Sequence, residues 1–323
     1  MKTIDPDMLA AINKHKELQA ADGGVPGTLI ENRRQQDRLA PYWSDGAPAV
    51  IEVADQTIPV HGEEREIRVY RPHNARQDAV ILFLHGGGWA RGTISTGDWA
   101  CHTFAADTNL TVVSLAYSLA PEAPFPAAIN DIRSTMDWCA EYGNELGFNG
   151  RRIFLTGTSA GGNLSVSAAL ARRDHGEFMP IGLAPLFGVF GDNLETDSYK
   201  EYGPGQYGLS HARMKQYFEW YVPEGKTPRE PLISPIHADL SGLPPTFIGI
   251  AEFDVLRDDS FLFAGKLAAT STPVTVRYYE GLAHGYAMFA RAVPAARRAL
   301  SETAAFFRDV AKVSHDAEIE TLQ

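Results

Sequence analysis

Short apolar runs with the lengths of β-strands recur along the chain after about residue 48. Residues 50–60 and 64–72 are rich in β-branched side chains and flank a polar turn at 61–63, which predicts a hairpin. Five later runs predict further strands, and the first three are apolar enough to be buried on both faces of a sheet. These five runs are 79–88, 110–117, 151–157, 244–254 and 274–285.

Apolar residues at helical spacing occupy the segments between several of these runs. Ala128 and Ile132 belong to such a set within 125–143, which predicts an amphipathic helix that buries one face. Two more helices are expected at 260–270 and 294–313. Strands that alternate with helices imply βαβ units, so we predict an α/β fold with a mostly parallel sheet and helices on both faces.

Two segments do not fit this alternation. Residues 1–47 are helical and polar, whereas residues 190–231 carry a dense set of aromatic side chains. The second segment is either an irregular surface insertion whose aromatic residues pack among themselves, or a lid. A lid would cover the carboxyl edge of the sheet, where ligands bind in open α/β folds. The pattern leaves both interpretations open.

Composition narrows the class of partner. The 323 residues include 29 Lys and Arg against 40 Asp and Glu, a formal net charge of −11, so we expect no nucleic-acid partner. No run reaches the ~18 apolar residues of a membrane span, and residues 1–20 lack the apolar core of a signal peptide. The two cysteines, Cys101 and Cys139, are typical of a reducing compartment. We therefore predict a cytoplasmic protein without a membrane span.

One serine lies between glycines where a predicted strand gives way to a helical pattern. Residues 157–161, GTSAG, fit the G-x-S-x-G pattern around Ser159. In such a turn the serine hydroxyl is held over the end of the sheet, and larger side chains at Gly157 or Gly161 would clash with backbone. Turn-forming Gly and Ser alone would also explain the stretch. The nucleophile hypothesis therefore needs partners elsewhere.

A glycine run at the end of an earlier strand supplies the first partner. The sequence HGGG at 85–88 lets the backbone approach a substrate and present N–H groups to it. Such donors stabilise the oxyanion of acyl transfer, each by roughly 3–4 kcal/mol. A phosphate loop is the competing interpretation, but the residues that follow, Trp89, Ala90 and Arg91, do not continue either phosphate-binding motif. The oxyanion interpretation is favoured.

A base and an acid are available at the ends of the last two predicted strands. His284 follows the final strand on a Gly-flanked loop. Glu252, Asp254, Asp258 and Asp259 surround the end of the strand before it. Asp254 is our choice because it lies just beyond that strand, whereas the two later aspartates fit the start of the next helix.

These motifs together resemble the hormone-sensitive-lipase-like branch of α/β-hydrolase esterases, particularly its bacterial carboxylesterases. The resemblance extends over about residues 80–290. Five segments carry it: 85–89, 117–131, 157–162, 254–258 and 284–286. It implies an α/β-hydrolase fold, with Ser159 as nucleophile, His284 as general base and acid, and Asp254 as the orienting carboxylate.

The resemblance also implies an oxyanion hole. Its backbone donors are expected at Gly87, Gly88 and Ala160, while His85 and Gly86 support the loop. No metal or cofactor is required by this chemistry, and the sequence contains no zinc or dinucleotide motif.

Family members carry a helical cap, which implies a division of this chain into two parts. Residues 1–47 and 190–231 would form the cap, and 48–189 with 232–323 the catalytic core. Two positions depart from the family pattern: Ser118 stands where arginine is usual and Val255 where proline is usual. Ser118 lacks the salt bridge or hydrogen bond with which an arginine would anchor its loop. Val255 lacks the ring with which a proline would stiffen the loop of Asp254.

The predicted function is hydrolysis of small, short-chain acyl esters through a Ser-His-Asp triad and an acyl-enzyme intermediate. An amidase or peptidase on the same triad is one alternative. A non-catalytic small-molecule receptor on the same fold is another, although the intact His-Gly-Tyr at 284–286 argues for an enzyme. The resemblance allows a homodimer and leaves the oligomeric state open.

Overall fold

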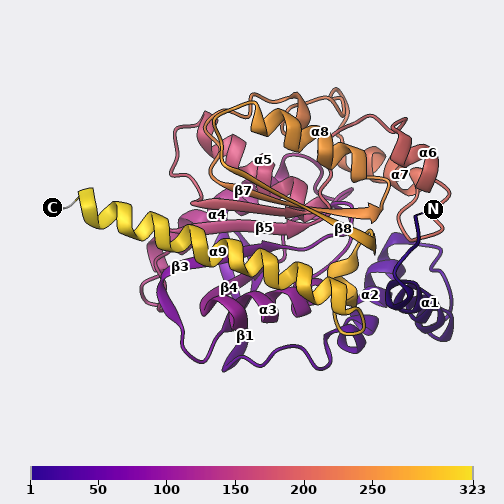
Figure 1. Cartoon of the computed structure of the whole chain (residues 1–323), viewed down its shortest axis with the longest axis horizontal. Coiled ribbons are helices and arrows are strands. Elements are labelled where there is room, and N and C mark those ends of the chain that lie inside the picture. The colour runs from indigo at the N-terminus through magenta and orange to yellow at the C-terminus, as the bar shows by residue number, and fades with distance from the viewer. Residues whose placement is uncertain (1, 322–323) are drawn as a thin grey trace.

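The apolar runs form one twisted sheet that carries helices on both faces (Figure 1). The computed structural model describes residues 2–321, with side chains described as far as residue 313. Residue 1 of the predicted cap and residues 322–323 of the predicted core lie outside the described residues. The strands are β1 (Glu52–Val60), β2 (Glu63–Arg71), β3 (Arg76–Leu84), β4 (Leu110–Leu115), β5 (Ile153–Thr158), β6 (Gly182–Leu186), β7 (Thr246–Phe253) and β8 (Val274–Ala283).

The helices fall in the predicted alternation, and two pairs lie outside it. The main helices are α3 (Asp98–Thr108), α4 (Ala127–Tyr142), α5 (Ala160–Asp174), α8 (Arg257–Ala268) and α9 (Pro294–Thr321). The other two pairs are α1 (Pro6–Ala21) with α2 (Leu29–Ser44), and α6 (Asp197–Tyr202) with α7 (His211–Tyr221). The helix predicted over 294–313 is present and continues to Thr321.

Strand pairing confirms the predicted mixed sheet with a parallel centre. The strand order is β1-β2-β4-β3-β5-β6-β7-β8. The β1–β2 hairpin and the β2–β4 pair are antiparallel, and every pair from β4–β3 to β7–β8 is parallel. The carboxyl ends of the parallel strands therefore meet at one edge of the sheet.

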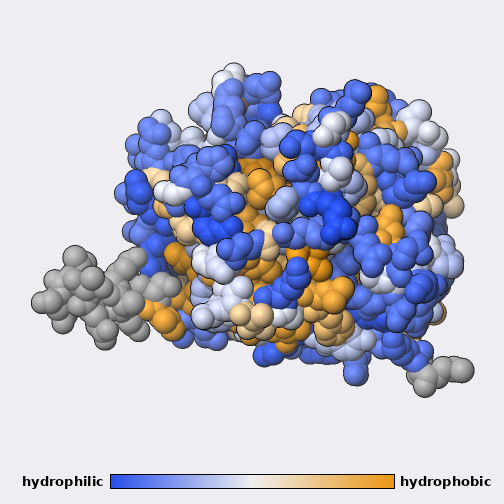
Figure 2. Space-filling view, turned by 90° about the horizontal axis from the view of Figure 1, so that it is seen from above, coloured by the Kyte–Doolittle hydropathy of each residue, from blue (hydrophilic) through white to orange (hydrophobic). Residues whose placement is uncertain are grey.

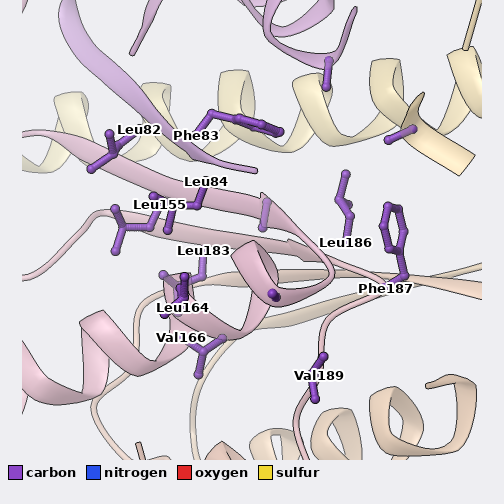
Figure 3. Close-up of a cluster of buried hydrophobic side chains, with 14 of the residues drawn as sticks. Leu82, Phe83, Leu84, Leu155, Leu164, Val166, Leu183, Leu186, Phe187 and Val189 are labelled. Carbon is purple, nitrogen blue, oxygen red and sulfur yellow. The ribbon is translucent and has the colours of Figure 1, made fainter. Parts of the chain in front are cut away.

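The central strands are buried because helices cover both of their faces. Every residue of β4, β6 and β7 is buried, which explains why these runs lack polar alternation. Helices α4, α5 and α8 pack on one face, and α3 and α9 pack on the other (Figure 1). Figure 3 shows Leu82, Leu84 and Leu155 of the strands beside Leu164 and Val166 of α5.

Two elements were not expected, α3 and β6. In α3, apolar residues occur around the whole helix, so the segment lacks the stripe that predicts an amphipathic helix. In β6, Pro185 argues against a central strand because proline has no N–H to donate. The N–H groups of Leu183 and Phe187 donate to Pro245 and Gly249 on the β7 side, and Pro185 lies between them. One β6–β7 hydrogen bond is therefore missing at Pro185.

The helices outside the alternation gather at one end of the molecule. Figure 1 shows α1, α2, α6 and α7 at the end of the sheet toward which the arrowhead of β8 points. A side-chain N-cap begins each of the four: Asp5 caps α1, Thr28 caps α2, Thr196 caps α6 and Ser210 caps α7. The two segments that the sequence sets apart thus lie on the same side of the fold.

The face of the molecule on the side of α8 is mostly hydrophilic. Figure 2, seen from the side of α8, shows hydrophobic residues gathered in patches between hydrophilic ones. On α8, Phe261 and Leu262 are exposed, as are Val276 and Tyr278 on the edge strand β8. The rings of Phe261 and Tyr278 lie 5.6 Å apart, so these residues adjoin.

Glycines allow β5 and the start of α5 to lie directly against the end of β3. A Cβ built on Gly157 would lie 2.5 Å from the carbonyl oxygen of Leu84. One built on Gly161 would lie closer than 3.0 Å to that same oxygen, where real Cβ atoms are essentially never found. The expected clash of larger side chains with backbone is therefore confirmed at both glycines.

The same substitution should have opposite effects in two helices. Gly161→Ala should lower the free energy of unfolding by about 3 kcal/mol or more, because the new methyl group overlaps a strand carbonyl that cannot move freely. Gly265→Ala in α8 should raise it by roughly 0.5–1 kcal/mol through helix propensity, because nothing lies within 4 Å of its Cβ. Urea denaturation measures both, and equal stabilities of the two variants would contradict the packing argument.

Candidate functional site

Ser159 occupies the turn between β5 and α5 in a strained backbone conformation. Its φ of 54° and ψ of −118° lie outside the regions that L-residues prefer. Such conformations cost of order 1–3 kcal/mol and persist where the surrounding structure enforces them. The Ser159 N–H donates to the carbonyl of Leu186 at 2.9 Å, which ties the turn to β6. The residue is 8% exposed.

His284 and Asp254 lie beside this serine, each just beyond the end of its strand. The distance from His284 Nε2 to Ser159 Oγ is 3.0 Å, and that from His284 Nδ1 to Asp254 Oδ2 is 2.7 Å. Asp254 is buried, and its other oxygen accepts the N–H of Leu256 at 2.9 Å. With the Nδ1 proton donated to the carboxylate, Nε2 is free to accept the serine proton.

The competing acidic residues have other partners. Glu252 accepts the N–H of Gly281 at 2.8 Å, which joins β7 to β8. Asp258 accepts the N–H of Ser198 at 2.7 Å. Burial raises the pKa of Asp259 to about 7. Among the described residues, Asp254 is the acid that hydrogen-bonds to the candidate base, so the structure places the chosen residue, rather than its neighbours, in that position.

The glycine run forms a tight turn next to the serine. Gly87 and Gly88 have φ values of 132° and 61°, which side chains rarely allow. No hydrogen bond within residues 2–321 has the N–H of either glycine as its donor. Ala160 is the first residue of α5, where N–H groups lack intrahelical acceptors and the helix dipole favours negative charge. These three positions can therefore supply donors to a developing oxyanion.

His85 lies beneath the glycine turn and contacts its backbone. Its Nδ1 donates to the carbonyl of Gly86 at 2.9 Å, and its ring stacks on Tyr117 at 4.2 Å. The Tyr117 hydroxyl donates to the His85 carbonyl at 2.7 Å. Burial lowers the pKa of His85 to about 4, so the ring is neutral at neutral pH. These contacts fit a role in holding the turn.

Aromatic residues of 190–231 pack on the catalytic loops and not only on one another. The Tyr221 ring stacks on Trp89 with 4.5 Å between ring centroids. Tyr217 lies against Gly88, because a Cβ built there would be closer than 3.0 Å to its ring. These contacts join the segment to the turn that follows β3, and the lid interpretation stays a prediction.

The expected loss of an anchor at Ser118 is compensated from another strand. Arg65 of β2 donates from Nη2 to Ser118 Oγ at 2.8 Å and from Nε to Asp131 at 3.0 Å. Asp131 also accepts the Ser118 N–H at 2.7 Å. A single arginine thus fixes the loop, although its position 53 residues earlier gave no sequence signal.

One aromatic neighbour of the candidate base was not predicted from the sequence. Phe187 directly follows β6, and its ring meets that of His284 edge-on at 5.2 Å. It is buried and has a positive φ of 39°. The signal available was its place after a parallel strand, but β6 itself was not expected.

Within residues 2–321 no group of three or more His, Cys, Asp or Glu side chains is arranged to hold a metal ion. The expectation of a cofactor-free enzyme stays a prediction. In the part of the chain that the structure describes, no helix is long and apolar enough to cross a membrane.

Comparisons with known proteins show the family and the fold to which the chain is similar. A family model described as the alpha/beta hydrolase fold matches residues 81–288. Carboxylesterase NlhH of Mycobacterium tuberculosis is 35% identical over 255 residues, which cover 77% of this chain and 80% of the relative. Among solved structures, a hyperthermophilic esterase from Pyrobaculum calidifontis is 30% identical with a TM-score of 0.87, covering 96% and 99% of the two chains. A thermostable esterase from Pseudomonas putida is 29% identical with a TM-score of 0.85, covering 94% and 96%.

The buried His85 should make stability depend on pH. Its pKa of about 4 lies below the usual 6.5, so the unfolded state takes up the proton first as pH falls. The contribution of the neutral, buried His85 to the free energy of unfolding is therefore complete above pH 6.5. It decreases by about 3 kcal/mol as the pH falls toward 4. His85→Gln should remove this part of the pH dependence. Urea denaturation of both proteins from pH 8 to pH 4 tests it; parallel curves would contradict the assignment.

Proposed function

Because the chain belongs to the hormone-sensitive-lipase-like branch of the α/β-hydrolase fold family and is a carboxylic ester hydrolase, we propose that it cleaves small acyl esters by serine catalysis. The observation that carries the proposal is the continuous chain of hydrogen bonds from Asp254 through His284 to Ser159. The fold brings these residues together from the ends of three different strands.

In the first step the serine hydroxyl attacks the ester carbonyl while His284 Nε2 takes its proton. Asp254 fixes the tautomer of His284 and stabilises the imidazolium that forms. The imidazolium then donates its proton to the departing alcohol, which leaves an acyl group on Ser159 Oγ. Water hydrolyses this acyl-enzyme by the same transfers in reverse.

The oxyanion is proposed to lie on the N–H groups of Gly87, Gly88 and Ala160. Support comes from the positive φ values of the two glycines and from the position of Ala160 at the start of α5. His85 and Gly86 are proposed to hold the turn without touching the substrate. This division fits the neutral, buried state of His85.

Small and uncharged acyl groups fit the surroundings of the serine best. Ser159 is 8% exposed, and the side chain of His284 is 14% exposed. Aromatic rings stand on two sides, with Phe187 against His284 and Tyr217 against Gly88. Burying a charged acyl group among such rings would be unfavourable without a partner charge.

The structure also bears on the proposed division into cap and core and on the two alternative functions, a non-catalytic receptor and an amidase. We propose residues 1–47 and 190–231 as the cap because their helices lie at the carboxyl edge of the sheet (Figure 1). A receptor without catalysis is not favoured, since the hydrogen bond between His284 and Ser159 is intact. No contact in the described chain favours an amide over an ester as substrate.

Location and oligomeric state stay predictions. Cys101 and Cys139 are both free and buried, which is compatible with the predicted cytoplasmic location. Light scattering decides the oligomeric state, because a homodimer has twice the 35.3 kDa mass of the chain. The edge strand β8, with Val276 and Tyr278 exposed, is where we expect a second copy to bind.

Removal of the serine hydroxyl should abolish turnover without loss of the fold. Ser159→Ala should lower kcat for p-nitrophenyl butyrate by about 10⁴-fold or more, because no other hydroxyl contacts His284 in the described chain. Ser167→Ala is the matched control, since Ser167 is buried in α5, the helix that follows Ser159, and its hydroxyl has no hydrogen-bond partner in the described chain. Full activity of Ser159→Ala would refute serine catalysis here.

Chain-length dependence tests the proposed substrate class. Hydrolysis of p-nitrophenyl acetate, butyrate, octanoate and laurate should decline toward the long chains, because aromatic rings crowd the serine. The comparison is made on kcat/KM at substrate concentrations where the esters stay dissolved. Activity restricted to acyl chains longer than about ten carbons would show that the acyl site is larger than proposed.

A further inference from the structure

Arg91 closes the turn that carries the proposed oxyanion donors. Its N–H donates to the carbonyl of Gly87 at 3.0 Å. Its own carbonyl lies against Gly87 from the other side, because a Cβ built on that glycine would be closer than 3.0 Å to the Arg91 oxygen. The backbone of Arg91 therefore limits how the peptide groups of Gly87 and Gly88 can turn.

The side chain of Arg91 reaches both segments of the proposed cap. Nη1 donates to Asn32 Oδ1 of α2 at 2.7 Å, and Nη2 donates to the hydroxyl of Tyr217 in α7. The guanidinium carbon lies 5.3 Å from the centre of the Tyr217 ring, within the range of a cation–π contact. One residue thus joins the oxyanion turn to α2 and α7.

Tyr217 also contacts the oxyanion turn directly, in addition to its hydrogen bond with Arg91. Its ring lies against Gly88, where even a methyl group would overlap it. The hydroxyl of the same ring accepts from Arg91. Movement of α7 would therefore displace both the ring that covers Gly88 and the acceptor that holds Arg91.

The remaining contacts of Arg91 give no other reason for its position. No carboxylate forms an ion pair with it within residues 2–321, in contrast to Arg33, which pairs with Glu122. Its Nε is buried and has no hydrogen-bond partner there. Leaving a buried donor unpaired costs about 1–3 kcal/mol, so this placement is not explained by stability alone.

We propose that Arg91 is a positioning residue that makes the alignment of the oxyanion donors depend on the docking of both cap segments. The inference rests on the proposed function, because it assigns a role to the turn only if an oxyanion forms there. When α2 and α7 are docked, their neutral acceptors hold the guanidinium, and the Arg91 backbone holds Gly87 and Gly88. When either helix moves away, the turn loses that support.

The first test removes the guanidinium and keeps the length of the side chain. Arg91→Met should lower kcat for p-nitrophenyl acetate about 10–100-fold, while KM changes less than about threefold, because donor alignment matters most in the transition state. Arg34→Met is the control on α2, since that arginine is exposed and its one ion pair within the described residues is with Glu31 of its own helix. It should match the wild type in both constants.

A thionoester, in which sulfur replaces the carbonyl oxygen, separates donor alignment from general structural damage. An oxyanion hole is shaped for oxygen, so misaligned donors slow the oxygen ester more than the thionoester. The ratio of kcat/KM for the ester to that for the thionoester should fall about tenfold or more in Arg91→Met. A merely structural role would slow both substrates equally and leave the ratio unchanged.

Tyr217→Phe provides a second variant in case Arg91→Met does not fold. It keeps the ring against Gly88 and removes only the acceptor for Arg91. We expect kcat to fall several-fold with a lower ester-to-thionoester ratio and an unchanged melting temperature.

Wild-type ratios in both folded variants, or in Tyr217→Phe if only that variant folds, would overturn the proposal. That result would leave the serine mechanism intact, because Ser159→Ala tests the mechanism separately. Activity that survives in Ser159→Ala would refute the proposed function instead, whatever the Arg91 variants show.

Discussion

The contact between the Leu84 carbonyl and the glycines of the β5–α5 turn is the constraint on which the site depends. Because Gly157 and Gly161 have no side chains, α5 can begin directly against the end of β3. This close approach places Ser159 beside the glycine turn that follows β3. A methyl group at either position would separate the two motifs, which are far apart in sequence and need to be neighbours for acyl transfer. Ser159, which lies between these two glycines, has a positive φ of 54°.

The proposed cap segments contact three regions that carry or adjoin proposed catalytic groups: the acid loop, the end of β8 and the oxyanion turn. Ser198 at the start of α6 donates to the carbonyl of Val255 at 2.7 Å, and so holds the acid loop despite the absence of the usual proline. The N–H of Asp5 donates to the carbonyl of Gly281 at 3.0 Å, just before the histidine loop. Arg91 joins the oxyanion turn to the other two cap helices. The proposed cap therefore makes hydrogen bonds to the loops that hold the proposed catalytic groups.

The sequence predicts those parts of the fold whose signal is local. The apolar runs and the glycine motifs are local, so the strands and the turn at Ser159 could be identified in advance. β6 was not predicted because Pro185 has no N–H to donate and so argues against a central strand. Hydrogen bonds from Leu183 and Phe187 to the β7 side hold β6 in the sheet, and these contacts between distant segments leave no local sequence signal. The anchor from Arg65 to Ser118 was equally hidden, since strand pairing alone brings these residues together. Asp254 could be chosen because strand ends share one edge of the sheet.

Arg91 lies outside the catalytic motifs, yet the type of side chain at this position decides whether the proposed oxyanion turn is connected to α2 and α7. A hydrophobic residue at this position could pack beneath the cap without reaching specific acceptors. A guanidinium needs directed partners, and here they come from Asn32 and Tyr217 on two separate segments. Tyr217 also lies against Gly88, where we propose that it narrows the acyl site. The same tyrosine accepts a hydrogen bond from Arg91, which we propose holds the oxyanion turn. The proposed acyl site and the proposed oxyanion turn therefore share Tyr217, so changes in the proposed cap should affect kcat as well as KM.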